Sequence, residues 1–148
     1  MFDPIKRARE SFARQNFLGL LGAKLQRLEP GACAITAPIH PDLTQQHGFA
    51  HAGVVTTLAD TAAGYAAYSL MPENASVLTV EFKVNLINPA AGQTLRAEAR
   101  TIKPGRTLSV VEADVFAIND ENEALAARMQ ATMMCLLGKA DDDSITRR

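Results

Sequence analysis

One segment of this chain, residues 45–60, holds residue types that could do acid–base or nucleophilic chemistry. It reads Gln-Gln-His-Gly-Phe-Ala-His-Ala-Gly-Val-Val-Thr-Thr-Leu-Ala-Asp, and the three histidines of the chain lie in it or just before it, at His40, His47 and His51. Backbone N–H groups at the start of a helix favour negative charge. A buried carboxylate can act as a base or a nucleophile. The segment offers both kinds of group within a few residues.

Asp60 is the candidate base or nucleophile because its local sequence gives it no partner. It stands about two turns into a helix predicted over 53–70, which is too deep to cap the helix. None of the residues three or four positions away is basic, so no local salt bridge explains the carboxylate; they are Thr56, Thr57, Ala63 and Gly64. A carboxylate on an apolar helix costs desolvation energy unless it has a partner or a function. The alternative is a hydrogen bond to a neighbouring strand or subunit, and the loop before the helix favours catalysis.

The loop becomes the helix at His51, Ala52 and Gly53. The N–H groups of Ala52 and Gly53 are candidates for the unpaired donors at the helix start. Two such donors form an oxyanion hole for a carbonyl under attack. An ordinary loop-to-helix junction, with glycine present for its backbone freedom, explains the same residues.

Other chemistries find less support. The three histidines with Asp60 could be metal ligands, because zinc sites use these residue types. However, His47 and His51 lie on a glycine-containing loop that does not fix their spacing, so we predict no metal site. The Gly-x-Ser-x-Gly elbow of serine hydrolases is absent from the sequence.

A basic turn, Lys103-Pro104-Gly105-Arg106, separates two strand-like runs. It is either a solvated hairpin turn or a docking point for the phosphates of a nucleotide-bearing substrate.

Hydrophobic periodicity predicts the elements that position these residues. The pattern over 53–70 has apolar residues at helical spacing and few charges, which is typical of a helix buried nearly all round. A short helix opened by Pro4 is predicted over 4–14. Strands are predicted in the second half of 17–28 and over 32–39, 78–86, 95–102, 107–118 and 124–136. Their short connections favour an antiparallel sheet.

The alternation is cleanest over 78–86. The apolar residues are Leu78, Val80, Phe82, Val84 and Leu86, and the residues between them are Thr79, Glu81, Lys83 and Asn85. Successive side chains of a strand point to opposite faces. The pattern therefore predicts one strand with a clean period of two.

The order of the predicted elements indicates the fold class, and the composition indicates the partners and the cellular compartment. One helix wrapped by one curved antiparallel sheet fits better than a doubly wound fold, which needs alternating helices. We predict one α+β domain over 1–148, with a frayed tail over 139–148.

A net charge of -1 gives no reason to expect nucleic acid or an anionic membrane as partner. No apolar run is long enough to span a membrane, and the two cysteines predict buried thiols in a reducing compartment, so we expect a cytoplasmic protein.

The motif over 45–53, followed by Leu58-Ala59-Asp60-Thr61-Ala62, resembles that of the hotdog-fold acyl-CoA thioesterases. The likeness is greatest to the phenylacetate-degradation (PaaI-like) group, whose signature is Asn or Gln, a loop ending in His-Gly-Gly, and then Leu-Ala-Asp-Thr-Ala in the helix. The strand ending Val84-Asn85-Leu86-Ile87-Asn88-Pro89-Ala90 also resembles the family's strand after the central helix. The resemblance covers about residues 15–137. It implies a hotdog fold: a long central helix wrapped by a curved, mostly antiparallel sheet of about five to six strands.

The resemblance also implies roles for single residues. Asp60 matches the carboxylate that activates water or attacks the thioester. Ala52 stands where the family has the Gly that donates an oxyanion N–H, with Gly53 as a second donor, and His51 precedes it. Gln45 matches the residue that positions substrate or water, although relatives with Gln there often carry Glu on the helix. Thr79 matches an assisting hydroxyl, and the coenzyme A contacts are assigned to His47, Gly48, Lys103 and Arg106.

The resemblance further implies the partners. The substrate is an acyl-CoA, no metal or separate cofactor is needed, and the minimal active unit is a homodimer, with a homotetramer expected. The active site of such dimers lies between subunits, so His51 and Ala52 would face Asp60 of the partner.

Three alternatives stay open. One is a non-catalytic acyl-CoA-binding protein on the same fold. Another is an enoyl-CoA hydratase, whose Asp-x-x-x-x-His spacing is absent because position 65 is Tyr. The last is a metal-dependent hydrolase.

Overall fold

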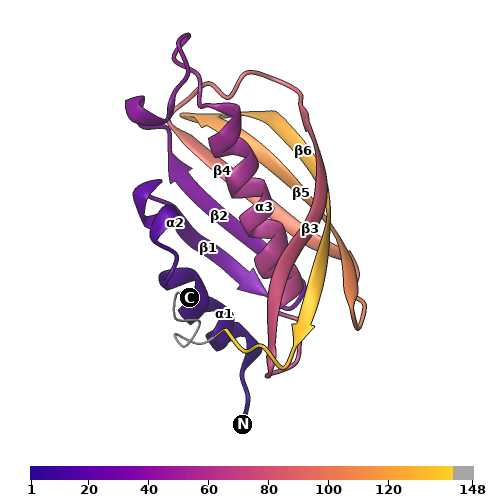
Figure 1. The fold of residues 1–148 in the computed structure, drawn as a ribbon. Helices are drawn as coiled ribbons and strands as arrows, with labels where there is room; N and C mark the ends of the chain where they lie inside the picture. The colour runs from indigo at the N-terminus through magenta and orange to yellow at the C-terminus, as the bar shows by residue number, and fades with distance from the viewer. Residues whose placement is uncertain (142–148) are drawn as a thin grey trace, which may run out of the picture.

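The computed structural model describes residues 1–141, which form a curved sheet with one long helix across one face (Figure 1). The strand order in this sheet is β1-β2-β4-β5-β6-β3, and all neighbouring strands are antiparallel. The strands are β1 (Lys24–Glu29), β2 (Ala32–Pro38), β3 (Ala75–Leu86), β4 (Thr94–Lys103), β5 (Leu108–Asn119) and β6 (Asn122–Leu137). The helices are α1 (Pro4–Ala13), α2 (Asn16–Leu20), the 3-10 helix η1 (Pro41–Leu43) and α3 (Ala52–Tyr68). This confirms the predicted α+β class.

The central helix α3 packs on the sheet mainly through small side chains. Its fully buried residues include Leu58, Ala59, Ala62, Ala63 and Ala66. Alanine loses no side-chain entropy on burial, and its small volume lets a helix lie close to the strands. Asp60 and Gly64 are only half-buried. The helix therefore presents its single carboxylate at the edge of the core.

Strand β3 departs from the alternation read in the sequence. Its pairing with β6 shifts register between Thr79 and Glu81, a β-bulge that adds one residue at Val80. Thr79 pairs with Met133 and Phe82 with Ala131, and both β6 partners are fully buried residues of the helix-covered face. Thr79 and Phe82 therefore lie on the same face, and the period of two predicted over 78–86 is interrupted at Val80, because a bulge reverses the phase of the alternation.

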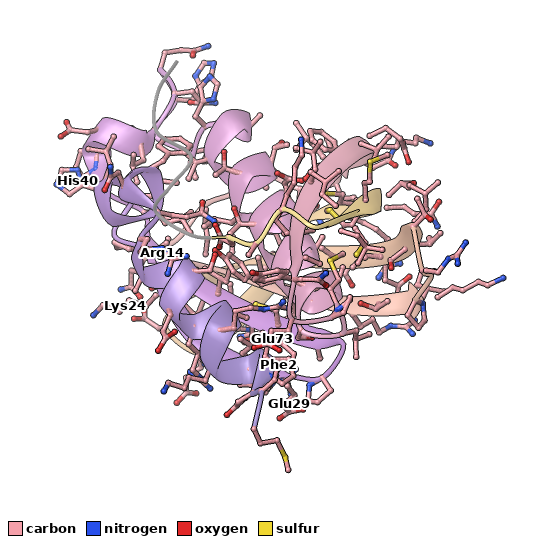
Figure 2. All side chains as sticks on the ribbon, turned by 60° about the horizontal axis from the view of Figure 1, so that its bottom comes forward. Phe2, Arg14, Lys24, Glu29, His40 and Glu73 are labelled. Carbon is pink, nitrogen blue, oxygen red and sulfur yellow. The ribbon has the colours of Figure 1, made fainter. Side chains whose placement is uncertain are left out.

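The N-terminal helix α1 is fixed to the C-terminal end of α3 by Arg7. The guanidinium donates to the carbonyl oxygens of Tyr68 at 2.8 Å, Pro72 at 2.6 Å and Met71 at 3.1 Å. The last carbonyls of a helix lack helical partners and favour a cation. Figure 2 shows this end of the molecule, with Phe2 near Glu73 and Arg14 at the opposite end of α1. Arg7 thus sets where the rest of α1 lies against α3.

The described C-terminal segment returns to α1. The side chain of Asp141 accepts a hydrogen bond from Ser11 and forms an ion pair with Arg14, N to O 3.2 Å. Residues 142–148 of the tail that we expected to fray lie outside the described part of the chain. Within residues 1–141, none of the helices combines the length and the apolar character needed to span a membrane.

Candidate functional site

Asp60 and Thr79 meet between α3 and β3. The Thr79 hydroxyl donates to Oδ1 of Asp60 at 2.8 Å and also lies 3.4 Å from the sulfur of Met133. Thr79 faces the helix because it pairs with the buried Met133, in the residue position just before the β3 bulge. Oδ2 of Asp60 has no hydrogen-bond partner among residues 1–141, so it is available to accept a proton.

The pKa of Asp60 is raised above its ordinary value. Burial disfavours the charged carboxylate, and the hydrogen bond from Thr79 opposes this by stabilising it. A carboxylate with a raised pKa is a stronger base than an exposed one, which suits general-base catalysis near neutral pH.

A cavity of about 480 Å³ lies beside Asp60. Its walls come from α3, from the first half of β3, from α1 and from Asp141, and its volume suits a small organic group. The residues that carry its polar groups are Ser11, Arg14, Gln15, Asp60, Thr61, Tyr65, Tyr68, Ser76, Thr79 and Asp141. Among residues 1–141, no three His, Cys, Asp or Glu side chains lie close enough to share a metal ion.

At the start of α3, His51 is the N-cap. Its Nδ1 accepts a hydrogen bond from the N–H of Gly53 at 2.9 Å. That bond occupies the N–H that the sequence suggested as a second oxyanion donor, so Gly53 does not fill this role in the observed geometry. The N–H of Ala52 has no partner among residues 1–141 and remains the candidate donor.

Gln45 and Ala52 line a second cavity, of about 400 Å³. Its other wall is the segment 86–90, which begins at the last residue of β3. Oε1 of Gln45 accepts a hydrogen bond from the N–H of His47 inside the loop. Gly48 follows at φ +82°, a left-handed conformation that favours glycine. Gln45 is therefore positioned by its own loop.

The predicted site residues thus form separate groups within one chain. Asp60 and Ala52 stand about two helical turns apart on α3, which is about 12 Å along the axis. Asp60 lies with Thr79, and Ala52 lies with Gln45. His47 and Gly48 are exposed on the loop. Lys103, the last residue of β4, and Arg106, on the β4–β5 turn, are both exposed. Arg106 lies near Leu70 and Pro72, beyond the opposite end of α3.

The two edges of the sheet differ in character. Strand β1 is short, and most of its exposed side chains are charged or polar: Lys24, Gln26, Arg27 and Glu29. Strand β3 is twice as long, and four of its apolar side chains are 43% to 57% exposed: Leu78, Val80, Phe82 and Leu86. A long apolar edge strand is a template for pairing with another chain, whereas charges protect an edge. The free edge next to Asp60 is the one suited to a partner.

Sequence reasoning did not find the part of the cavity beyond Asp60. Ser11 lies in the helix predicted over 4–14, Gln15 lies between predicted elements, and Tyr65 was considered only for the absent hydratase spacing. Gly64 was noted only as a neighbour of Asp60, and a Cβ added there would meet no atom within 4 Å. Glycine inside a helix costs about 1 kcal/mol relative to alanine, so a glycine in an alanine-rich helix was a signal for open space.

The family model of the Thioesterase superfamily matches residues 47–124. A provisionally named esterase of Halobacterium salinarum is 32% identical over 112 residues, 72% of this chain and 74% of its own length. The crystal structure of a thioesterase family protein from Silicibacter pomeroyi has a TM-score of 0.89 at 51% identity, covering 90% of this chain and 98% of that one. A mutant of a phenylacetic acid degradation protein from Thermus thermophilus has a TM-score of 0.70 at 22% identity, covering 81% and 98%. This last likeness is one of fold.

Proposed function

Because this chain belongs to the hotdog-fold thioesterase superfamily, we propose that it hydrolyses an acyl-CoA thioester to a free carboxylic acid and coenzyme A. The observation that carries the proposal is the Asp60 carboxylate, half-buried on α3, held by Thr79 and open on one side to a cavity. A carboxylate in such a site can take a proton from water or attack a carbonyl itself.

In the proposed reaction Asp60 accepts a proton from water while the water oxygen bonds to the thioester carbon. The carbonyl electrons move onto oxygen, and the resulting oxyanion accepts a hydrogen bond from the N–H of Ala52. Collapse expels the coenzyme A thiolate, which takes up the proton. With Asp60 as nucleophile instead, a mixed anhydride forms and water then cleaves it. Both routes consume one water, need no separate cofactor and give the same products.

The reaction requires the donor and the base to reach the same carbonyl. Because about 12 Å along α3 separates Ala52 from Asp60 in one chain, we assign them to different subunits. Pairing of two β3 edges around a two-fold axis would add the loop of one subunit to the Asp60 cavity of the other. The homodimer would then hold two equivalent sites. A homotetramer formed from two such dimers remains a proposal drawn from the family.

The coenzyme A moiety is assigned to exposed residues. His47 and Gly48 lie on the loop beside Ala52, and Lys103 and Arg106 supply positive charge for phosphates. Gln45 would position the reacting group once the partner's cavity adjoins its own.

The test is thiol release from a panel of aryl and aliphatic acyl-CoA thioesters by the wild type and by Asp60→Asn. Loss of the base should lower kcat by about 10²- to 10⁴-fold. Burial raises the pKa of Asp60, so the stability that this group contributes is present at low pH and is lost as the pH rises through its folded-state pKa. The Asn variant should therefore melt at the same or a higher temperature at neutral pH.

Equal turnover by both proteins would remove Asp60 from the mechanism. Tight binding of the thioesters by the wild type without turnover of any of them would favour a non-catalytic acyl-CoA-binding protein.

A further inference from the structure

We propose that the segment after β6, a strap formed by residues 138–141, is a gate at the α1 end of the Asp60 cavity. The strap is closed in this structure, where Asp141 holds it against α1. It opens when water replaces the contacts of Asp141. The gate controls access to the cavity, whatever reaction takes place there.

The strap crosses from the sheet to the N-terminal helix. Strand β6 ends at Leu137, which pairs with Ala75 at the start of β3. Gly138 follows at φ +72°, a left-handed conformation that favours glycine, and its N–H donates to the carbonyl oxygen of Asn74 at 2.8 Å. From this turn the chain runs toward α1 (Figure 1). The strap therefore bridges the space between the sheet and α1, with a glycine where it leaves the sheet.

The far end of the strap is anchored at one residue, Asp141. Residues 138–140 are exposed, and residues 139–140 form no hydrogen bond or ion pair within the described chain. The Asp141 carboxylate accepts a hydrogen bond from the Ser11 hydroxyl and forms an ion pair with Arg14, N to O 3.2 Å. Nη2 of Arg14 also donates to the carbonyl oxygen of Asp141 at 2.8 Å. Both partners lie at the C-terminal end of α1.

The contacts that close the strap are polar and partly exposed. The side chains of Arg14 and Asp141 are 41% and 36% exposed. An ion pair of this exposure adds little net stability, because water replaces its contacts and salt screens it. The strap reads Gly-Lys-Ala-Asp and buries no large apolar side chain. Segments with few buried apolar contacts open locally at low cost, so the strap can leave α1 while the sheet and α3 stay folded.

Opening of the strap would change the wall of the Asp60 cavity. Asp141 lines this cavity together with its partners Ser11 and Arg14. The walls from α3 and β3 belong to elements that pack in the core or pair in the sheet, so they do not move without unfolding. Displacement of Asp141 therefore widens the cavity beside α1 and leaves every helix and strand in place.

A cysteine placed inside the cavity measures this opening. Gly64→Cys is suitable, because Gly64 lines the cavity and a Cβ there meets nothing within 4 Å. Its alkylation by iodoacetamide, a small neutral reagent, is followed by mass spectrometry. Adding Asp141→Ala should raise the alkylation rate by about fivefold or more, because an ion pair and a hydrogen bond to a carboxylate are lost together.

Salt provides a second measurement that needs no change in the strap. Raising NaCl from about 0.05 M to about 0.5 M should accelerate alkylation of Gly64→Cys, because the Arg14–Asp141 pair is screened. The same change should have little effect once Asp141→Ala is present.

Two controls separate opening of the strap from other effects. Asp42→Ala removes an exposed carboxylate on η1 that does not line the cavity, so it should leave the rate at position 64 unchanged. Cys33, fully buried on β2, reports global unfolding in the same spectra, and its alkylation should stay slow in every variant.

A rate at position 64 that neither Asp141→Ala nor salt raises would overturn the gate. A rate that rises only in step with alkylation of Cys33 would overturn it too, because the strap would then support the whole fold. The alkylation uses no thioester, so its outcome is independent of whether the proposed hydrolysis is right.

Discussion

The two ends of the predicted catalytic segment differ in how complete they are within one chain. Asp60 is half-buried, hydrogen-bonded to Thr79 and enclosed on several sides by α1, α3 and β3. Ala52 lies at the start of α3 beside an exposed loop, and its N–H has no partner within residues 1–141. The comparison teaches that one chain encloses the carboxylate that we propose as the base, whereas the N–H that we propose as the oxyanion donor is left without a partner for a second subunit's substrate to use.

The largest expected effect on kcat comes from Ala52→Pro, which removes the N–H that we propose as the oxyanion donor. Proline is well tolerated at the first position of a helix, and His51 before it is already extended, with φ -60° and ψ 141°. The change therefore removes the N–H while keeping the helix start. It should lower kcat by about 10²- to 10³-fold with little change in Tm.

Ala52→Ser, which keeps the N–H, is the control and should lose far less activity. If Ala52→Pro folds normally and retains full kcat, the donor at Ala52 is not used.

For the proposed base, Thr79→Val tests the hydrogen bond between Thr79 and Asp60. Removing the hydroxyl takes away a hydrogen bond that lowers the pKa of Asp60, so the pKa should rise further. Because the ionised carboxylate is the active form, the acidic limb of the kcat profile should move to higher pH. The loss of kcat should be largest on this acidic limb and small at a pH well above the pKa of Asp60.

Thr132→Val is the matched control, because the Thr132 hydroxyl donates to Glu81, on the opposite face of the sheet from Thr79. An unmoved acidic limb in Thr79→Val, or one displaced to lower pH, would contradict the role given to this hydrogen bond.

The smallest effect concerns the space beside Asp60. Gly64→Ala should stabilise the fold by about 0.5–1 kcal/mol, because alanine is the better helix former and its Cβ meets nothing within 4 Å. The added methyl enters the cavity, so kcat/KM for bulky acyl groups should fall modestly. Chemical denaturation measures the first effect and the thioester panel the second.

Gly105→Ala provides the contrast, since a Cβ there would lie 1.9 Å from the carbonyl oxygen of Leu108. It should destabilise the protein. A loss of stability in Gly64→Ala would show that the cavity is not open as described.

The fold was largely predictable because its elements carry strong local signals. Pro4 opened a helix, the apolar pattern over 53–70 gave α3, and alternating runs gave five of the strands within one to three residues at most ends. Helix α2 (Asn16–Leu20) was missed, because five residues with an internal glycine give too short a pattern to recognise.

The candidate site was predictable only in part, for reasons of geometry. Asp60 was found because a carboxylate on an apolar helix needs an explanation. The contact with Thr79 could not be derived from the strand pattern, because a bulge reverses the alternation without a clear sequence signal. Tyr65 and Gln15 meet across 50 residues of sequence, and no local pattern encodes such a contact.

The proposed division of the active site between two chains is tested most directly by mixing two variants, each defective in one of the two proposed catalytic groups. Asp60→Asn and Ala52→Pro chains, each nearly inactive alone, are unfolded and refolded together in equal amounts, and thioesterase activity is measured. A mixed dimer would contain one intact site, with Asp60 from one chain and the Ala52 N–H from the other. Random assortment predicts recovery of about a quarter of wild-type activity. Activity no greater than the mean of the two variants refolded separately would show that each chain completes its own site.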